Sequence, residues 1–108
     1  SEVDTLKLSL YLNLASCYIK LEVWEQVVRN CTDALAIDPS SVKALFRRST
    51  YLEMHKKDWD GAMKDLKKCQ ELNGEKEDSL VTKAVERIKR HQAKEKATEK
   101  KMWGKAFS

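Results

Sequence analysis

Apolar residues recur along most of the chain at steps of three and four, with polar residues between them. Few runs of β-branched residues occur, none of those runs alternates cleanly with polar residues over the length of a strand, and the chain has one proline and three glycines. The pattern predicts an all-α protein with helices over residues 6–20, 24–37, 41–55, 59–72 and 77–104. Pro39 and Gly74 stand where the second and fourth helices are expected to end.

The first and second helix pairs align with each other 34 residues apart. Ala15 aligns with Ser49, and, after one extra residue in the second turn, Trp24 aligns with Trp59. Antiparallel helix pairs with this period are typical of tetratricopeptide repeats. The sequence therefore predicts an α-solenoid of two repeat units, residues 5–39 and 40–74, after a disordered remnant at 1–4 and before a C-terminal extension helix at 77–106.

The extension helix has an apolar first half and a polar second half. We expect an apolar stripe to cover the open face of the second repeat, formed by Leu80, Val81, Ala84, Val85 and Ile88. Residues 89–101 are nearly all polar and should be exposed on all sides. Met102, Trp103 and Phe107 restore hydrophobicity at the tail, which suggests a contact with a neighbour or an oligomer seam.

The formal net charge of +4 is concentrated in this last helix. Residues 1–74 carry eleven Lys/Arg and eleven Asp/Glu, so the excess lies beyond them. A basic segment could bind nucleic acid, but this one lacks the interleaved aromatic residues that stack on bases, so that reading ranks last. No apolar run approaches the roughly 20 residues of a membrane span, and no signal peptide is seen.

The chemistry-bearing residues do not form a catalytic or metal-binding pattern. The three cysteines, Cys17, Cys31 and Cys69, show no zinc spacing, and we expect small buried thiols in a reducing compartment. His55 and His91 have no nucleophile placed beside them, and no glycine-rich phosphate loop exists. The chain is therefore expected to be a binding module with no catalytic residue, no metal and no cofactor.

Lys43 and Arg47 are the leading candidates for a binding site. They lie four residues apart, so a helix places both on one face, where their repulsion is unfavourable unless an anion binds. The first helices of stacked repeats line a concave groove, and Asn13 aligns with Arg47 in the repeat. Asn13, Lys43 and Arg47 are predicted to face this groove, where their donors suit carboxylates. The alternative is that both cations only solvate a helix surface.

Three segments, LNLASCYIKL (12–21), ALAIDP (34–39) and VKALFRR (42–48), resemble the tetratricopeptide domain of large immunophilins. These are the multidomain FKBP-type and cyclophilin-type peptidyl-prolyl isomerases. The tail at 88–96, with Met102 and Phe107, is similar to their long final helix. The residues do not distinguish the FKBP from the cyclophilin branch.

The resemblance implies a carboxylate clamp for the C-terminal Met-Glu-Glu-Val-Asp peptide of heat-shock protein 90. Asn13, Lys43 and Arg47 match three clamp positions, and the parent's isomerase domain lies outside this chain. It also implies a cytoplasmic protein, with a nuclear location as a further option. The alternative function is a generic repeat scaffold that binds another protein or itself.

The chain departs from the family in its number of repeats. The family has three, and the two present correspond to the second and third, so the clamp lacks the Lys and Asn that the first supplies. The helix over residues 6–19 would also expose a face on which a second copy could pack. Family members have been associated with calmodulin through the last helix, where the matching basic amphipathic segment is Lys83, Val85, Arg87, Ile88, Lys89, Arg90 and Lys94. A plain capping helix is the favoured reading of that segment.

Overall fold

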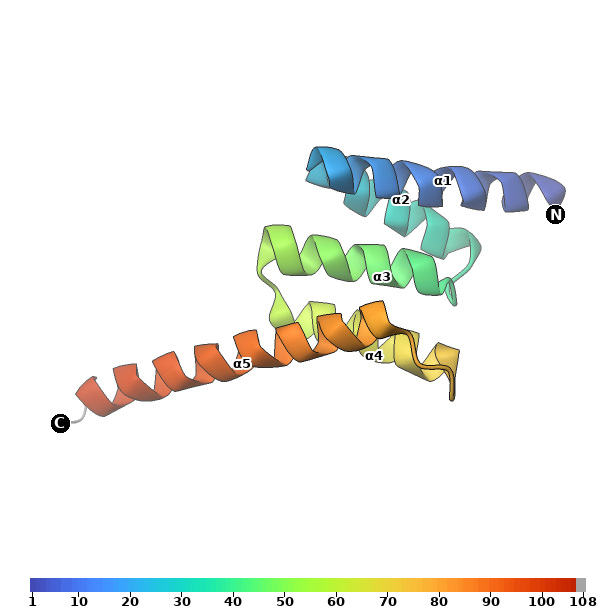
Figure 1. Cartoon of the computed structure of the whole chain (residues 1–108). Helices are drawn as coiled ribbons and strands as arrows, with labels where there is room; N and C mark the ends of the chain where they lie inside the picture. The colour runs from blue at the N-terminus through green and yellow to red at the C-terminus, as the bar shows by residue number, and fades with distance from the viewer. Residues whose placement is uncertain (107–108) are drawn as a thin grey trace.

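The computed structural model describes residues 1–106, and every element in them is helical (Figure 1). In chain order the elements are α1 (Glu2–Leu21), α2 (Trp24–Ile37), α3 (Val42–Tyr51), the π-helical turn η1 (Leu52–Lys56), α4 (Trp59–Asn73) and α5 (Ser79–Ala106). Each helix packs against the next one in the chain, which gives an elongated body of 64 × 33 × 21 Å. The all-α solenoid prediction is confirmed. Within residues 1–106, no helix is both long and apolar enough to span a bilayer.

The predicted disorder at residues 1–4 is wrong, because α1 begins at Glu2. The Ser1 hydroxyl accepts a hydrogen bond from the Asp4 backbone N–H at 3.2 Å and so caps the helix. Glu2 and Asp4 place negative charge in the first turn, where it interacts favourably with the helix dipole. Local capping therefore extends α1 well beyond its apolar pattern.

The remaining boundaries follow from caps that the sequence supplies. The Ser41 hydroxyl accepts from the Ala44 N–H and starts α3, and the Asp58 carboxylate accepts from the Gly61 N–H and starts α4. Gly74 ends α4 with a φ of 62°, in the left-handed region that glycine adopts without strain. The first residue of α3 is thereby fixed, and with it the direction in which each α3 side chain points.

The extra residue of the second repeat is accommodated by η1. Its five residues continue α3 with the wider hydrogen-bond spacing of a π-helix, which absorbs an insertion without ending the helix. Two side chains of η1 then contact neighbouring helices, one in the first repeat and one in the extension helix. His55 stacks on Trp24 of α2 with ring centroids 5.8 Å apart, and Glu53 accepts from the Arg87 guanidinium of α5. The insertion therefore contacts α2 through His55 and α5 through Glu53.

The larger apolar core lies between α3, α4 and α5, and a smaller one lies between α1 and α2. In α5, Val81, Ala84, Val85 and Ile88 are buried as predicted. Leu80 is not, since 62% of its surface is exposed. It stands in the first turn of α5, one position before the stripe that meets α4, so the prediction that it caps the repeat is wrong.

The outer half of α5 is exposed from Ala93 to Ala106, whereas the turn just before it, which holds His91 and Gln92, contacts the second repeat. The His91 ring stacks flat on Trp59, with centroids 4.1 Å apart, and the Gln92 amide donates to the Asp60 carboxylate at 2.9 Å. The prediction of full exposure over residues 89–101 is therefore wrong for His91 and Gln92. Beyond this contact α5 projects away from the repeats (Figure 1). Phe107, part of the predicted apolar tail, lies outside the described residues.

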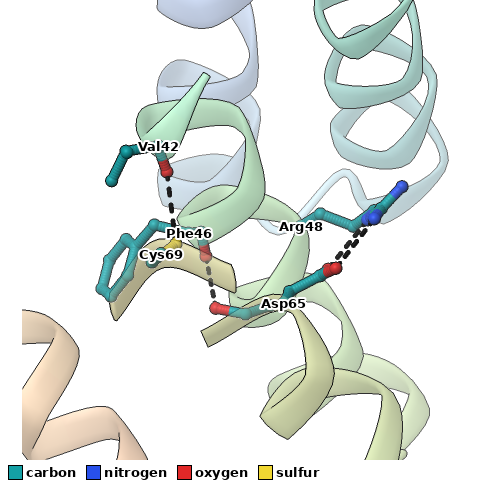
Figure 2. Close-up of polar contacts among 6 residues, drawn as sticks. Val42, Phe46, Arg48, Asp65 and Cys69 are labelled. Atoms are coloured by element: carbon teal, nitrogen blue, oxygen red, sulfur yellow. Dashed lines mark hydrogen bonds and ion pairs between the residues drawn. The ribbon is translucent and has the colours of Figure 1, made fainter. Parts of the chain in front are cut away.

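An ion pair in the interior joins α3 to α4 (Figure 2). The Arg48 guanidinium donates through Nε and Nη2 to the two carboxylate oxygens of Asp65, at 2.8 and 2.7 Å. Hydrogen bonding to this carboxylate raises the pKa of Arg48 above its ordinary value. A bidentate ion pair of this kind fixes the relative position of the two helices more tightly than apolar packing alone.

Two of the three cysteines match the prediction of buried thiols. Cys31 and Cys69 are fully buried, and burial raises the pKa of each to about 11. The Cys69 thiol donates a weak hydrogen bond to the Val42 carbonyl, with 3.6 Å between Sγ and O (Figure 2). Cys17 is exposed, so the prediction fails there, because it lies on the side of α1 away from α2.

Candidate functional site

A groove of about 390 Å³ runs between α1, α3 and the start of α5. The α3 side contributes Val42, Lys43, Phe46, Arg47 and Thr50. The opposite walls contribute Ser16, Ile19 and Lys20 from α1, and Asp78 and Leu80 from the beginning of α5. Elements far apart in the sequence therefore build one concave surface with both cationic and apolar parts.

The α3 wall follows directly from helix geometry. Lys43, Arg47 and Thr50 are spaced by four and three residues, so they share one face, and Ser41 sets the phase of that face by capping the helix. Lys43 is exposed and Arg47 is half-buried. Sequence reasoning predicted these two cations on one face, and the structure places both in the groove.

The cations of the groove have no carboxylate partner in the part of the chain that the structure describes. Among residues 1–106, no ion pair involves Lys20, Lys43 or Arg47. Arg47 also has its Nη1 atom buried without a hydrogen-bond acceptor. Burying a charged donor unpaired is unfavourable, and native structures rarely leave such a group without a purpose. An anion in the groove would relieve the mutual repulsion of the cations that line it.

Arg47 and Arg48 differ sharply although they are adjacent in sequence. Arg48 is engaged by Asp65 in the bidentate ion pair described above. Arg47 lines the groove instead, because one residue turns a helix by about 100°. The first arginine is therefore available to a ligand, and the second belongs to the fold.

Asn13 is the one predicted site residue that the structure leaves apart from the other two. It lies on α1 three residues before Ser16, is exposed, and does not line the groove. The groove thus brings together Lys43 and Arg47 but not Asn13. A ligand that extends beyond the groove along α1 would be needed to contact it.

Sequence reasoning assigned only Lys43 and Arg47 to this lining and missed the other residues, among them Lys20, Asp78 and Leu80. Lys20 could have been found, because it continues the spacing of Asn13 and Ser16 along one face of α1. Asp78 and Leu80 carried no such signal. Their place depends on the path of the connection between α4 and α5, which no local pattern determines.

The other residues considered for catalysis, metal binding or partner binding make packing contacts within the fold or form no site. His55 and His91 are stacked on Trp24 and Trp59 and have no nucleophile partner. Within the described residues no group of three His, Cys, Asp or Glu could hold a metal. Val85 and Ile88, the apolar part of the segment considered for calmodulin, are buried against the second repeat. The apolar side chains of that segment are therefore not accessible to calmodulin while α5 packs on the repeat.

Comparison with known proteins supports the repeat assignment, although no model of a protein family matches the chain. The chain is 34% identical over 98 residues to peptidyl-prolyl cis-trans isomerase FKBP4 of Mus musculus, covering 88% of this chain and 21% of that protein. It is 36% identical over 80 residues to sperm-associated antigen 1 of Mus musculus, which covers 74% of this chain and 8% of the relative. It is also 40% identical over 67 residues to protein unc-45 homolog B of Xenopus laevis, covering 62% of this chain and 7% of the relative.

These three relatives all contain tetratricopeptide repeats. The chain spans about a fifth of the length of FKBP4 and aligns outside its isomerase domain. The resemblance to the tetratricopeptide domain of an immunophilin is thus confirmed, and the named immunophilin relative is of FKBP type. The chain is a protein-interaction module related to a non-catalytic part of such an isomerase.

Proposed function

We propose that this tetratricopeptide segment, related to that of FKBP-type immunophilins, binds the acidic C-terminal peptide of a chaperone through the groove between α1 and α3. The observation that carries the proposal is that Lys20, Lys43 and Arg47 line one groove and form no ion pair among residues 1–106. The ligand we propose is the Met-Glu-Glu-Val-Asp terminus of heat-shock protein 90. The terminal α-carboxylate and the last Asp side chain would bind Lys43 and Arg47, and the Asn13 amide would act from α1.

The apolar part of the groove fits the rest of such a peptide. Ile19, Val42 and Phe46 lie beside the two cations and offer a surface for the aliphatic side chain that precedes the terminal residue. Arg binds carboxylates with a planar fork, whereas Lys contributes a compact charge, so the pair can accept two neighbouring carboxylates. Because Lys43 is exposed, the attraction should weaken as salt is added.

The test is calorimetry of the 108-residue chain with the synthetic peptide Met-Glu-Glu-Val-Asp. Replacing both Lys43 and Arg47 by Ala should abolish measurable binding, since each charged hydrogen bond contributes about 1.5–3 kcal/mol. That loss corresponds to a factor of roughly ten or more in affinity for each residue. The matched control is Lys64→Ala with Lys67→Ala, which removes the same charge from exposed positions of α4. Equal binding by both double variants would refute the proposal.

A second candidate function is association with another protein, or with a second copy, through α1. The exposed side of α1 carries Leu6 at 71%, Leu10 at 55% and Leu21 at 69% exposure. Exposed apolar surface on one helix face is the feature that marks an interaction site. Sedimentation of the chain at high concentration should show a dimer if two copies pair, and Leu6→Glu with Leu10→Glu should return it to a monomer. A single monomeric species throughout would contradict self-association.

A further inference from the structure

The groove carries one carboxylate, and its position is informative. Asp78 lines the same 390 Å³ groove as Lys20, Lys43 and Arg47, yet it forms no ion pair with any of them. Its Oδ1 atom accepts from the Leu80 N–H at 2.9 Å and from the Val81 N–H at 3.5 Å, which caps the first turn of α5. The second carboxylate oxygen has no hydrogen-bond donor among the described residues.

Asp78 lies at the α3 N-terminal end of the groove. Asp78 also lines a second hollow together with Gln70 and Asn73 at the end of α4, next to Cys69. Cys69 in turn donates to the carbonyl of Val42, the first residue of α3. Lys20 stands at the opposite end, because α1 and α3 run in the same direction and Lys20 is in the last turn of α1 (Figure 1).

The groove therefore has a charge gradient along its length. Lys20 and Arg47 make one end positive, Lys43 follows, and Asp78 makes the other end negative. Beside Asp78, the exposed Leu80 offers apolar surface with no neighbour of its own chain covering most of it. A peptide lying in the groove would meet a surface at this end that repels acids and accepts apolar or basic side chains.

We propose that Asp78 is a specificity-determining residue, which ranks C-terminal tails by the charge of the side chain that lies at the start of α5, beyond the part of the groove that meets Lys20, Lys43 and Arg47. This inference rests on the proposed function of the groove. A tail with a further carboxylate at the start of α5 is disfavoured, and a tail with a neutral or basic side chain there is preferred. Among tails with two terminal carboxylates, a class that includes Met-Glu-Glu-Val-Asp, those with neutral or basic side chains upstream should therefore bind more tightly than those with acidic ones.

The test uses Asp78→Asn in the full chain, because Asn is as good a helix N-cap as Asp and removes only the charge. Three synthetic peptides serve as probes: Met-Glu-Glu-Val-Asp, and two versions in which both Glu residues are replaced by Gln or by Lys. We expect Asp78→Asn to raise the affinity for the Glu peptide by about two- to fivefold and to lower the affinity for the Lys peptide by about two- to fivefold, which is the size expected for an exposed charge pair. The affinity for the Gln peptide should stay within about a factor of 1.5. The opposite signs for the Glu and Lys peptides are a readout that loss of structure cannot produce.

The outcomes separate the two proposals. If Asp78→Asn changes the three peptides equally, or not at all, while Arg47→Ala still abolishes binding, the role of Asp78 is overturned and the function of the groove stands. If the unaltered chain binds none of the three peptides, the proposed function fails, and the specificity proposal fails with it. As a control, Asp58→Asn caps α4 in the same way but lies outside this groove, and it should shift none of the affinities.

Discussion

Alanine substitution should separate the two neighbouring arginines of α3 into one that stabilises the fold and one that binds. Arg48 forms two hydrogen bonds with Asp65, at 2.8 and 2.7 Å, and the Asp65 side chain is only 6% exposed. Arg47 forms no ion pair and faces the groove. The same chemical change at adjacent positions should therefore have opposite consequences.

The size of the effect at Arg48 follows from what its removal leaves behind. In Arg48→Ala, the buried Asp65 carboxylate loses both of its guanidinium hydrogen bonds, and breaking a buried ion pair in this way costs about 3–5 kcal/mol. The Arg48 side chain itself is 36% exposed, so water reaches part of the pair and the lower end of this range applies. We expect a loss of about 3 kcal/mol from a total stability that is typically about 5–15 kcal/mol for a single domain.

Arg47→Ala should change the free energy of unfolding by less than about 1 kcal/mol, because it removes a buried donor atom, Nη1, that has no acceptor among the described residues. The assay is urea unfolding followed by circular dichroism at 222 nm for both variants, with Arg48→Lys as an intermediate that keeps the charge but loses the fork. In calorimetry at low temperature, where Arg48→Ala is still folded, that variant should bind the acidic peptide and Arg47→Ala should not. Equal destabilisation by the two substitutions, or a loss under 1 kcal/mol for Arg48→Ala, would refute this division of roles.

Two further predictions concern η1 and the buried thiols. Deleting Met54 removes the extra residue of η1, so His55 should turn by about 100° around the helix axis, away from Trp24. In the unaltered chain, His55→Ala should change the tryptophan emission, and in the deletion variant the same substitution should have no effect. An equal emission change in both backgrounds would contradict the role given to η1. In the folded chain, the thiols of Cys31 and Cys69 have pKa values of about 11, against an ordinary value of 9.0. Because the unfolded chain therefore loses these protons at lower pH, the free energy of unfolding should fall as the pH rises from 9 to 11. The fall is at most about 1.4 kcal/mol per pH unit for each thiol. Cys31→Ala should flatten that fall in urea unfolding at several pH values, and an unchanged slope would contradict it.

The helices and their repetition could be predicted from the sequence because both are local properties. Steps of three and four residues, together with Pro39 and Gly74 as stops, give the helices, and the alignment of Trp24 with Trp59 gives the repeat. Lys43 and Arg47 were predicted to share a face for the same reason, since four residues make about one turn. Even the π-helical turn had a signal, namely the extra residue in the second repeat.

Only the tertiary structure decided which partner each side chain meets. The sequence offers Arg47 and Arg48 as equals, and it is the position of α4 that pairs Arg48 with Asp65 and leaves Arg47 to the groove. The course of the α4–α5 connection brought Asp78 to the groove and left Leu80 exposed. Helical periodicity specifies the face on which a residue lies, whereas what covers that face depends on helices far away in the sequence. The cations of the candidate site could therefore be predicted locally, but the carboxylate proposed to select their ligand could not.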